Sequence, residues 1–130
     1  MLELYYYENS ICSERALMVL AEKNETDWVP HHVHLFEHEQ FDPEYLKLNP
    51  KAQVPTLVHD GAIIRESSLI ADYLDDLYPT PMLKPTKLLE IARMREWIKE
   101  ADEAGYEGVA SLSFVIIFRA KLMAMSEQDR

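Results

Sequence analysis

The stretch Gln53-Val54-Pro55-Thr56-Leu57 decides how the neighbouring chain is expected to fold. Proline cannot donate a hydrogen bond to a sheet ladder, so it belongs at the first residue of a strand or at a sheet edge. A proline that turns the chain sharply into a strand is also a candidate for a cis peptide bond. Such a turn predicts that the backbone N–H and C=O of Val54 face outward, where a peptide-like ligand can pair with them as an added strand.

The composition is that of a folded, acidic protein. Of 130 residues, 48% are apolar and 10% are aromatic, which is enough for a packed core in one domain, or in one small domain plus part of another. The net charge of −10 argues against binding to nucleic-acid phosphates. No signal peptide and no membrane-spanning run is visible. The single cysteine, Cys12, excludes an internal disulfide, and we expect a soluble cytoplasmic protein.

Upstream of the Val54-Pro55 turn, the pattern predicts a strand, a helix and a second strand. Residues 2–7 alternate as in a half-buried strand. Apolar residues then recur at helical spacing, from about Cys12 or Ser13 to Lys23. Residues 29–35 alternate again, and Pro30 places this second strand at an edge. The unit predicts a right-handed crossover between parallel strands.

Downstream, two short strands and a helix complete the predicted sheet. A short helix fits residues 43–48, after which residues 56–59 and 62–65 predict a hairpin around Asp60-Gly61. Residues 69–77 carry an apolar helical stripe. The order β-α-β-β-β-α predicts a single four-stranded mixed sheet with helices packed on it.

A boundary is expected where prolines become frequent. Residues 1–79 form the first predicted domain, and residues 80–86 form a proline-spaced linker. Residues 87–130 predict an all-α segment, with a long helix from about Lys87 that breaks near Gly105 or Gly108. A further helix is expected from Leu112 to Met125. Two helices do not bury a core, so we expect an incomplete domain, or one completed by association.

The strand-to-helix corner at residues 9–15 is a candidate chemical site. Amides at a helix N-terminus are orphan donors with partial positive charge, and they stabilise a thiolate. That thiolate can be Cys12 itself, or the thiol of a ligand that accepts a hydrogen bond from Ser10 or Ser13. The alternative is structural: the serines cap the helix and Cys12 packs inward.

Glu66, Ser67 and Ser68 form a second candidate site at the start of the third predicted helix. The serines are N-cap residue types, and their hydroxyls and neighbouring N–H groups can also hold a ligand carboxylate. Glu66 can bind an α-ammonium group beside it. A carboxylate and an amine on one carbon describe the γ-glutamyl end of glutathione.

No metal site is expected. The histidines, at positions 31, 32, 34, 38 and 59, lack ligand spacing with a second cysteine. The chain has three glycines and no glycine-rich phosphate loop.

Three motifs together resemble the glutathione transferase superfamily. They are Ser10-Ile11-Cys12-Ser13-Glu14-Arg15, the run Leu48–Leu57 and the run Asp60–Leu74. The resemblance covers the thioredoxin-like glutathione-binding domain, residues 1–79, and the helical start of the second domain. It points to a bacterial branch that is similar to zeta-class enzymes, reductive dehalogenases or β-aryl etherases. Ile11 departs from the zeta isomerases, which carry a serine there.

The resemblance implies a set of glutathione-binding residues. Val54, before a cis-Pro55, would pair with the cysteinyl unit, while Glu66 and Ser67 would hold the γ-glutamyl end. Gln53 would contact the glutathione backbone, and either Lys51, or His38 and Gln40, would reach the glycyl carboxylate.

The resemblance also implies a glutathione S-transferase activity. A glutathione thiolate, stabilised by Ser10 and assisted by Ser13 and the helix dipole, would attack a hydrophobic electrophile. Two alternatives stay open: Cys12 can act as a redox nucleophile on a glutathione adduct, as in reductive dehalogenases or thiol oxidoreductases, or the chain can be a non-catalytic interaction module. Family members form homodimers, so a homodimer is expected.

Overall fold

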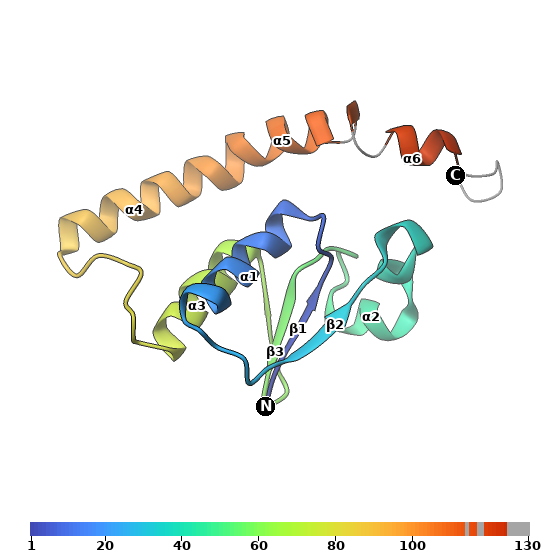
Figure 1. Ribbon diagram of the computed structural model, residues 1–130. Helices are drawn as coiled ribbons and strands as arrows, with labels where there is room; N and C mark the ends of the chain where they lie inside the picture. Colours follow the sequence, from blue (N-terminus) through green and yellow to red (C-terminus); the bar gives the residue numbers. More distant parts are fainter. Residues whose placement is uncertain (114, 117–118, 125–130) are drawn as a thin grey trace. The chain divides into compact units, whose positions relative to one another are not determined.

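A computed structural model describes residues 1–113, 115–116 and 119–124 of the chain (Figure 1). The chain divides into two compact units, Met1–Lys84 and Pro85–Arg130. The first unit contains the sheet and the second is helical.

The sheet has four strands in the order β2-β1-β3-β4. The central strand β1 (Leu2–Tyr6) pairs in parallel with β2 (Val29–His32) and antiparallel with β3 (Thr56–His59). Strand β3 in turn pairs antiparallel with β4 (Ala62–Arg65). The predicted mixed sheet, its strand order along the chain and the edge position of Pro30 are confirmed.

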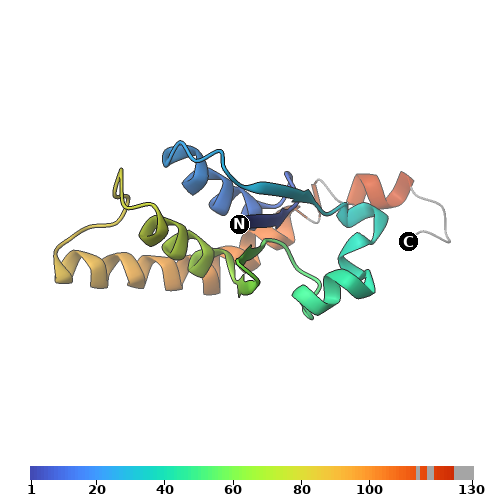
Figure 2. The same cartoon turned by 90° about the horizontal axis from the view of Figure 1, so that it is seen from below.

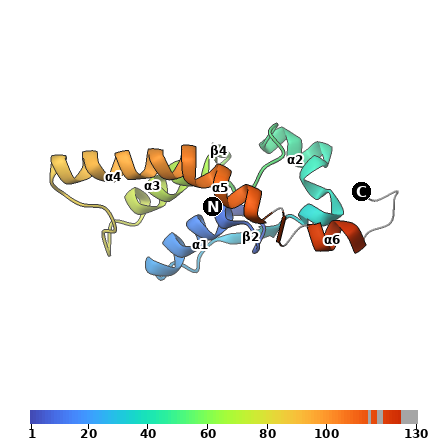
Figure 3. The same cartoon turned by 90° about the horizontal axis from the view of Figure 1, so that it is seen from above.

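The core lies between one face of the sheet and two helices, α1 (Ile11–Glu22) and α3 (Ser67–Leu77). Side chains alternate along a strand, so Leu2 and Leu4 share the face that α1 and α3 cover. Tyr5 points to the opposite face, where its ring lies 5.9 Å from that of Tyr45 in α2 (Pro43–Leu48). The three views show α2 on the other side of the sheet from α1 and α3 (Figure 1, Figure 2 and Figure 3). The core residues are Leu2, Leu4, Ala16, Leu20, Leu57, Ile70 and Leu74.

The second predicted strand is too long at its C-terminal end. β2 ends at His32, and the chain then forms two 3₁₀ turns, η1 (Leu35–Glu37) and η2 (Glu39–Phe41). Val33 still donates its N–H to the Tyr6 carbonyl at 2.8 Å and is buried, which is why the apolar alternation continues past the strand. His38, between the two turns, has a positive φ of 63°.

The predicted N-cap of α3 is also wrong. The N-cap residue is Glu66, which makes no side-chain capping bond, and Ser67 is already the first helical residue. Glu66 takes a φ of 68°, a left-handed backbone conformation that serine capping geometry does not use. The short helix α2 matches the predicted residues 43–48. Asp42 is its N-cap and accepts the Glu44 N–H at 2.8 Å, and Pro43 occupies the first turn.

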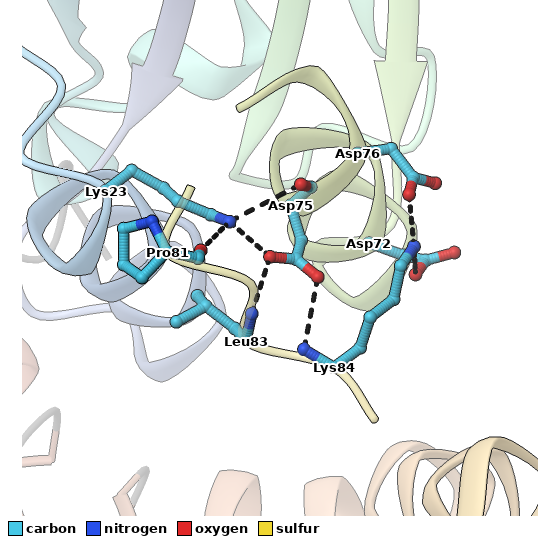
Figure 4. Close-up of polar contacts among 7 residues, drawn as sticks. All are labelled: Lys23, Asp72, Asp75, Asp76, Pro81, Leu83 and Lys84. Carbon is cyan, nitrogen blue, oxygen red and sulfur yellow. Dashed lines mark hydrogen bonds and ion pairs between the residues drawn. The ribbon is translucent and has the colours of Figure 1, made fainter. Parts of the chain in front are cut away.

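Residues 81–84, which the sequence assigns to a linker, are bound to the first unit (Figure 4). The ammonium of Lys23, at the end of α1, donates to the carboxylate of Asp75 in α3 and to the carbonyl of Pro81. The same carboxylate accepts the N–H groups of Leu83 at 3.0 Å and Lys84 at 3.2 Å. The Lys23 side chain is fully buried and Asp75 is 6% exposed, so this is a buried ion pair.

The second unit begins with α4 (Leu88–Glu100), which runs through the π-helical turn η3 (Ala101–Gly105) into α5 (Tyr106–Ser113) (Figure 3). The break predicted near Gly105 or Gly108 is therefore absent, because the helix continues as a π-helical turn up to Gly105 and Gly108 lies inside α5. Of the helix predicted from Leu112 to Met125, residues 112–113 belong to α5 and residues 119–124 form α6 (Arg119–Ala124), while residues 114, 117–118 and 125 are outside the described residues. None of the helices in the described residues combines the length and apolarity needed to cross a bilayer.

Candidate functional site

The strand register brings the predicted site segments to one end of the sheet. Tyr5 of β1 pairs with Thr56 of β3, and Thr56 pairs with Arg65 of β4. The segment after β1 carries Ser10, the segment before β3 carries Val54, and the segment after β4 carries Glu66. Because β1 and β4 both run antiparallel to β3, all three segments leave the sheet at the same end.

Ser10 is the N-cap of α1 and has extended backbone angles. Its Oγ accepts the N–H of Ser13 at 3.4 Å. A hydroxyl has one proton and two acceptor lone pairs, so accepting this bond leaves the Ser10 proton available to donate. Ser10 is half-buried and stands where the partial positive charge of α1 is greatest.

The other two residues of this corner have different surroundings. Ser13 is fully buried and its Oγ accepts the Tyr7 N–H at 3.2 Å, which gives its hydroxyl a role inside the fold. Cys12 is half-buried and is the second residue of α1. A thiol there lies within the first helical turn, where orphan N–H groups favour a thiolate.

The Val54-Pro55 peptide bond is cis, which confirms the prediction from the sequence. Pro55 is buried and Val54 is half-buried. Among the hydrogen bonds within the described residues, none uses the backbone N–H or C=O of Val54. The side chain of Gln53 is exposed beside them.

Lys51 and Glu66 meet across the site. The Lys51 Nζ lies 2.6 Å from the Glu66 Oε1, and both side chains are largely exposed. Ser67 opens α3 next to Glu66 and is half-buried. The N–H groups of the first turn of α3 are orphan donors, so they present an anion-binding position beside a carboxylate.

His38 and Gln40 lie in the segment after β2. Because β2 is parallel to β1, this segment leaves the sheet at the same end as the Ser10 segment. His38 is exposed, and its ring lies 6.3 Å from that of Phe41. The Oε1 atom of Gln40 is buried and has no hydrogen-bond partner in the described part of the chain.

A polar network behind the Val54 turn was not predicted from the sequence. The hydroxyl of Tyr45 donates to the Gln53 carbonyl at 2.6 Å, and the Asn49 Nδ2 donates to the same carbonyl at 2.8 Å. Both side chains also contact the Thr56 hydroxyl, at 3.1 and 3.0 Å. The one available signal was Asn49 before Pro50, a dipeptide typical of turns, which says nothing of these partners.

No cluster of three or more potential metal ligands occurs among the described residues. The segments at this end of the sheet include the Ser10 hydroxyl, the backbone N–H and C=O of Val54, the Glu66 carboxylate and the Lys51 ammonium. Such a set can hold a zwitterionic peptide through its backbone and its charged ends.

Comparison with known proteins places this arrangement in a family. Residues 4–82 match the family model described as the N-terminal domain of glutathione S-transferase. Protein LigF from Sphingobium sp. strain SYK-6 is 32% identical over 130 residues, covering 98% of this chain and 50% of that protein. Glutathione S-transferase Z1 from Arabidopsis thaliana is 40% identical over 88 residues, covering 67% of this chain and 39% of that protein.

Solved structures give the same result. The crystal structure of the β-etherase LigF from Sphingobium sp. strain SYK-6 matches with a TM-score of 0.87 and covers 98% of this chain and 53% of that one, at 32% identity. A Sulfitobacter glutathione transferase homolog with bound glutathione matches with a TM-score of 0.78 and 25% identity, covering 99% of this chain and 59% of that one. The chain spans about half the length of the proteins that it matches. Because the family model matches more than half of the chain, from β1 to residue 82, the chain belongs to the glutathione S-transferase family.

Proposed function

We propose that the chain binds glutathione and presents its thiolate to an electrophilic small molecule. The observation that carries this proposal is the meeting, at one end of the sheet, of a capping serine, an unpaired backbone segment and a carboxylate at a helix start. The serine follows β1, the backbone segment precedes β3 and the carboxylate follows β4. In that order across the sheet, they suit the thiol, the cysteinyl backbone and the γ-glutamyl end of the tripeptide.

In the proposed complex, the N–H and C=O of Val54 pair with the cysteinyl unit as an added strand. The carboxylate of the γ-glutamyl end accepts from the first N–H groups of α3 and from Ser67, while Glu66 binds its ammonium group. Lys51, His38, Gln40 and Gln53 form the rim that contacts the glycyl end. The Lys51 ammonium, already paired with Glu66, supplies positive charge to a site on an acidic protein.

Ser10 stabilises the sulfur. Its hydroxyl donates a hydrogen bond to the glutathione thiolate while accepting from Ser13, and the N-terminus of α1 adds partial positive charge. Both effects favour the charged form of the thiol and lower its pKa, which raises the concentration of the nucleophile at neutral pH.

The similarity to LigF over 98% of this chain favours an ether as the electrophile. The thiolate attacks the carbon that carries the ether oxygen, a C–S bond forms, and the C–O bond breaks. The departing oxygen takes the electron pair and then a proton. The proposal includes a homodimer, as the family resemblance implies.

The position of Cys12 in the first turn of α1 favours one second candidate. Its thiolate can attack the sulfur of a glutathione–substrate thioether. An S–S bond then forms, the C–S bond breaks, and the substrate carbon takes the electron pair and a proton. A second glutathione reduces the mixed disulfide. This chemistry is that of a reductive dehalogenase.

Calorimetric titration of the chain with glutathione tests the proposal. The control ligand is an analogue in which a methyl group replaces the thiol, and we expect it to bind more weakly because it cannot use Ser10. A β-aryl ether and a chlorinated hydroquinone then distinguish the two chemistries by release of a phenol or of chloride. A chain that binds neither peptide would instead be a non-catalytic interaction module.

A further inference from the structure

The peptide unit between Gln53 and Val54 has one side fixed by buried donors. The Gln53 carbonyl accepts two hydrogen bonds, from the Tyr45 hydroxyl at 2.6 Å and from the Asn49 Nδ2 at 2.8 Å. Tyr45 is 6% exposed and Asn49 is 3% exposed. Hydrogen bonds shielded from water in this way hold their geometry against competing solvent.

The planarity of the peptide bond carries this constraint to Val54. In the described residues the cis bonds are Val54-Pro55 and Thr80-Pro81, so the Gln53–Val54 bond is trans. In a planar trans peptide the C=O and N–H bonds point in opposite directions. A Gln53 carbonyl that points inward to Tyr45 and Asn49 therefore turns the Val54 N–H outward.

The same two side chains hold the other side of the turn. The Thr56 hydroxyl is fully buried and contacts the Tyr45 hydroxyl at 3.1 Å and the Asn49 Nδ2 at 3.0 Å. Asn49 also accepts the Lys51 N–H at its Oδ1 (3.1 Å), and its carbonyl accepts the Ala52 N–H (2.9 Å). Buried hydrogen bonds therefore hold the chain on both sides of Val54, at the Gln53 carbonyl and at the Thr56 hydroxyl.

We propose that Tyr45 and Asn49 are positioning residues that aim the Val54 N–H at the cysteinyl unit of glutathione, a role that rests on the proposed function. Neither side chain touches the ligand in this arrangement. Both act through the Gln53 carbonyl, which lies on the inner side of the peptide plane. Burial raises the pKa of the Tyr45 hydroxyl, which keeps it protonated and able to donate.

The test compares Tyr45→Phe and Asn49→Leu with the matched control Tyr73→Phe. The control also removes one tyrosine hydroxyl that makes a hydrogen bond, to His59 Nδ1 at 2.6 Å, but His59 lies at the other end of β3. For each folded variant, calorimetry gives the Kd for glutathione. We expect Kd to rise about tenfold in each test variant, the effect of weakening one backbone hydrogen bond to the ligand, and to stay unchanged in the control.

A second measurement needs no ligand. Residual dipolar couplings of the ¹⁵N-labelled chain report the direction of the Val54 N–H, with the amides of β1 and β3 as the internal reference. We expect the Val54 coupling to change in Tyr45→Phe, Asn49→Leu and their double variant, while the strand couplings and all couplings of Tyr73→Phe match the wild type. Should the double variant not fold, the single variants carry both readouts.

An unchanged Val54 coupling in the folded test variants overturns the positioning role, and so does an equal rise of Kd in Tyr73→Phe. A wild-type chain that binds no glutathione overturns the proposed function and the role toward that ligand. The dipolar couplings still decide in that case whether Tyr45 and Asn49 set the peptide plane, so the two failures are distinguishable.

Discussion

Ser10 and Cys12 are two residues apart, yet their positions suit different chemistry. Ser10 is the N-cap, and its hydroxyl keeps a proton to donate after accepting from Ser13. Cys12 is inside the first turn and, like Ser10, half-buried, and the orphan N–H groups of that turn favour a thiolate. In the proposed function Ser10 therefore stabilises the ligand thiolate, and in the alternative chemistry Cys12 is the resolving thiol.

Replacement of Ser10 by alanine tests this division. Ser10→Ala is expected to raise the pKa of the bound glutathione thiol, because the thiolate loses a hydrogen-bond donor. Turnover should fall about 10²-fold, the usual effect of removing one hydrogen bond that stabilises an anion in an active site. The ultraviolet absorbance of the thiolate as a function of pH gives the pKa. Cys12→Ser is the control and should leave both quantities unchanged. Loss of activity in Cys12→Ser alone would support the reductive chemistry instead.

Ala52 carries a backbone cost that glycine would remove. Its φ is 53°, in the left-handed region where a Cβ costs about 1–2 kcal/mol. Glycine loses about 0.5–1 kcal/mol more backbone entropy on folding, so Ala52→Gly should raise the free energy of unfolding by about 0.5–1 kcal/mol. Urea unfolding measures the change. Ala62→Gly, in strand β4, should change it in the opposite direction by a similar amount, and equal signs would contradict this explanation.

At the scale of elements, one buried ion pair joins α1, α3 and residues 81–84. Burial opposes ionisation of Asp75, but the ammonium of Lys23 and the N–H groups of Leu83 and Lys84 together lower its pKa below the ordinary value. An acid with a lowered folded-state pKa stabilises the fold when it is ionised. The contribution of the Asp75 carboxylate to the free energy of unfolding is complete above the pKa that this group has in the unfolded chain. It is lost as the pH falls through the pKa that the group has in the folded protein.

Asp75→Asn should therefore destabilise the protein in a pH-dependent way. At neutral pH the free energy of unfolding should fall by about 3 kcal/mol, because the variant leaves the buried Lys23 ammonium without its counter-charge. The difference from the wild type should be constant above about pH 5 and shrink at lower pH, where Asp75 becomes protonated first in the unfolded chain and then in the folded one. Chemical denaturation over a pH series measures this profile.

The exposed pair Glu44–Lys47 offers the control for that profile. Glu44→Gln also removes a carboxylate paired with a lysine, but solvent screens this pair, so the loss should stay below about 1 kcal/mol. A loss in Asp75→Asn no larger than in Glu44→Gln would show that burial of the Lys23–Asp75 pair adds nothing.

At the scale of the whole molecule, the first unit contains its own core. All seven core residues lie between Leu2 and Leu74, and the unit ends at Lys84. The sequence placed the domain end at residue 79, before the segment that the Lys23–Asp75 pair holds. In the second unit, every residue of α4 is at least partly exposed.

Two truncated chains test where the first domain ends. A chain of residues 1–84 should fold cooperatively and keep the glutathione affinity of the full chain. A chain of residues 1–79 lacks the Pro81 carbonyl and the N–H groups of Leu83 and Lys84. It should be less stable by about 4 kcal/mol or more, since a hydrogen bond to a charged group contributes about 1.5–3 kcal/mol. Equal thermal unfolding of the two chains would place the boundary at residue 79.

Much of the fold followed from local pattern. Alternation located the strands and the three-to-four-residue spacing located α1 and α3, because both patterns reflect which face of an element is buried. Pro55 signalled the cis turn, since few other residues suit that position. The serine N-caps of α3 and the long second strand were wrong, because Glu66 and Val33 depend on contacts from distant parts of the chain.

The sequence by itself determined the order of elements, the family resemblance and the turn at Val54-Pro55. Only the tertiary structure decided that Ser13 is buried, that Lys51 pairs with Glu66, that Tyr45 and Asn49 hold the Gln53 carbonyl, and that Lys23 and Asp75 bind residues 81–84. The reason is physical. A repeating pattern reports burial along one element, whereas a hydrogen bond or ion pair depends on where a second element places its partner.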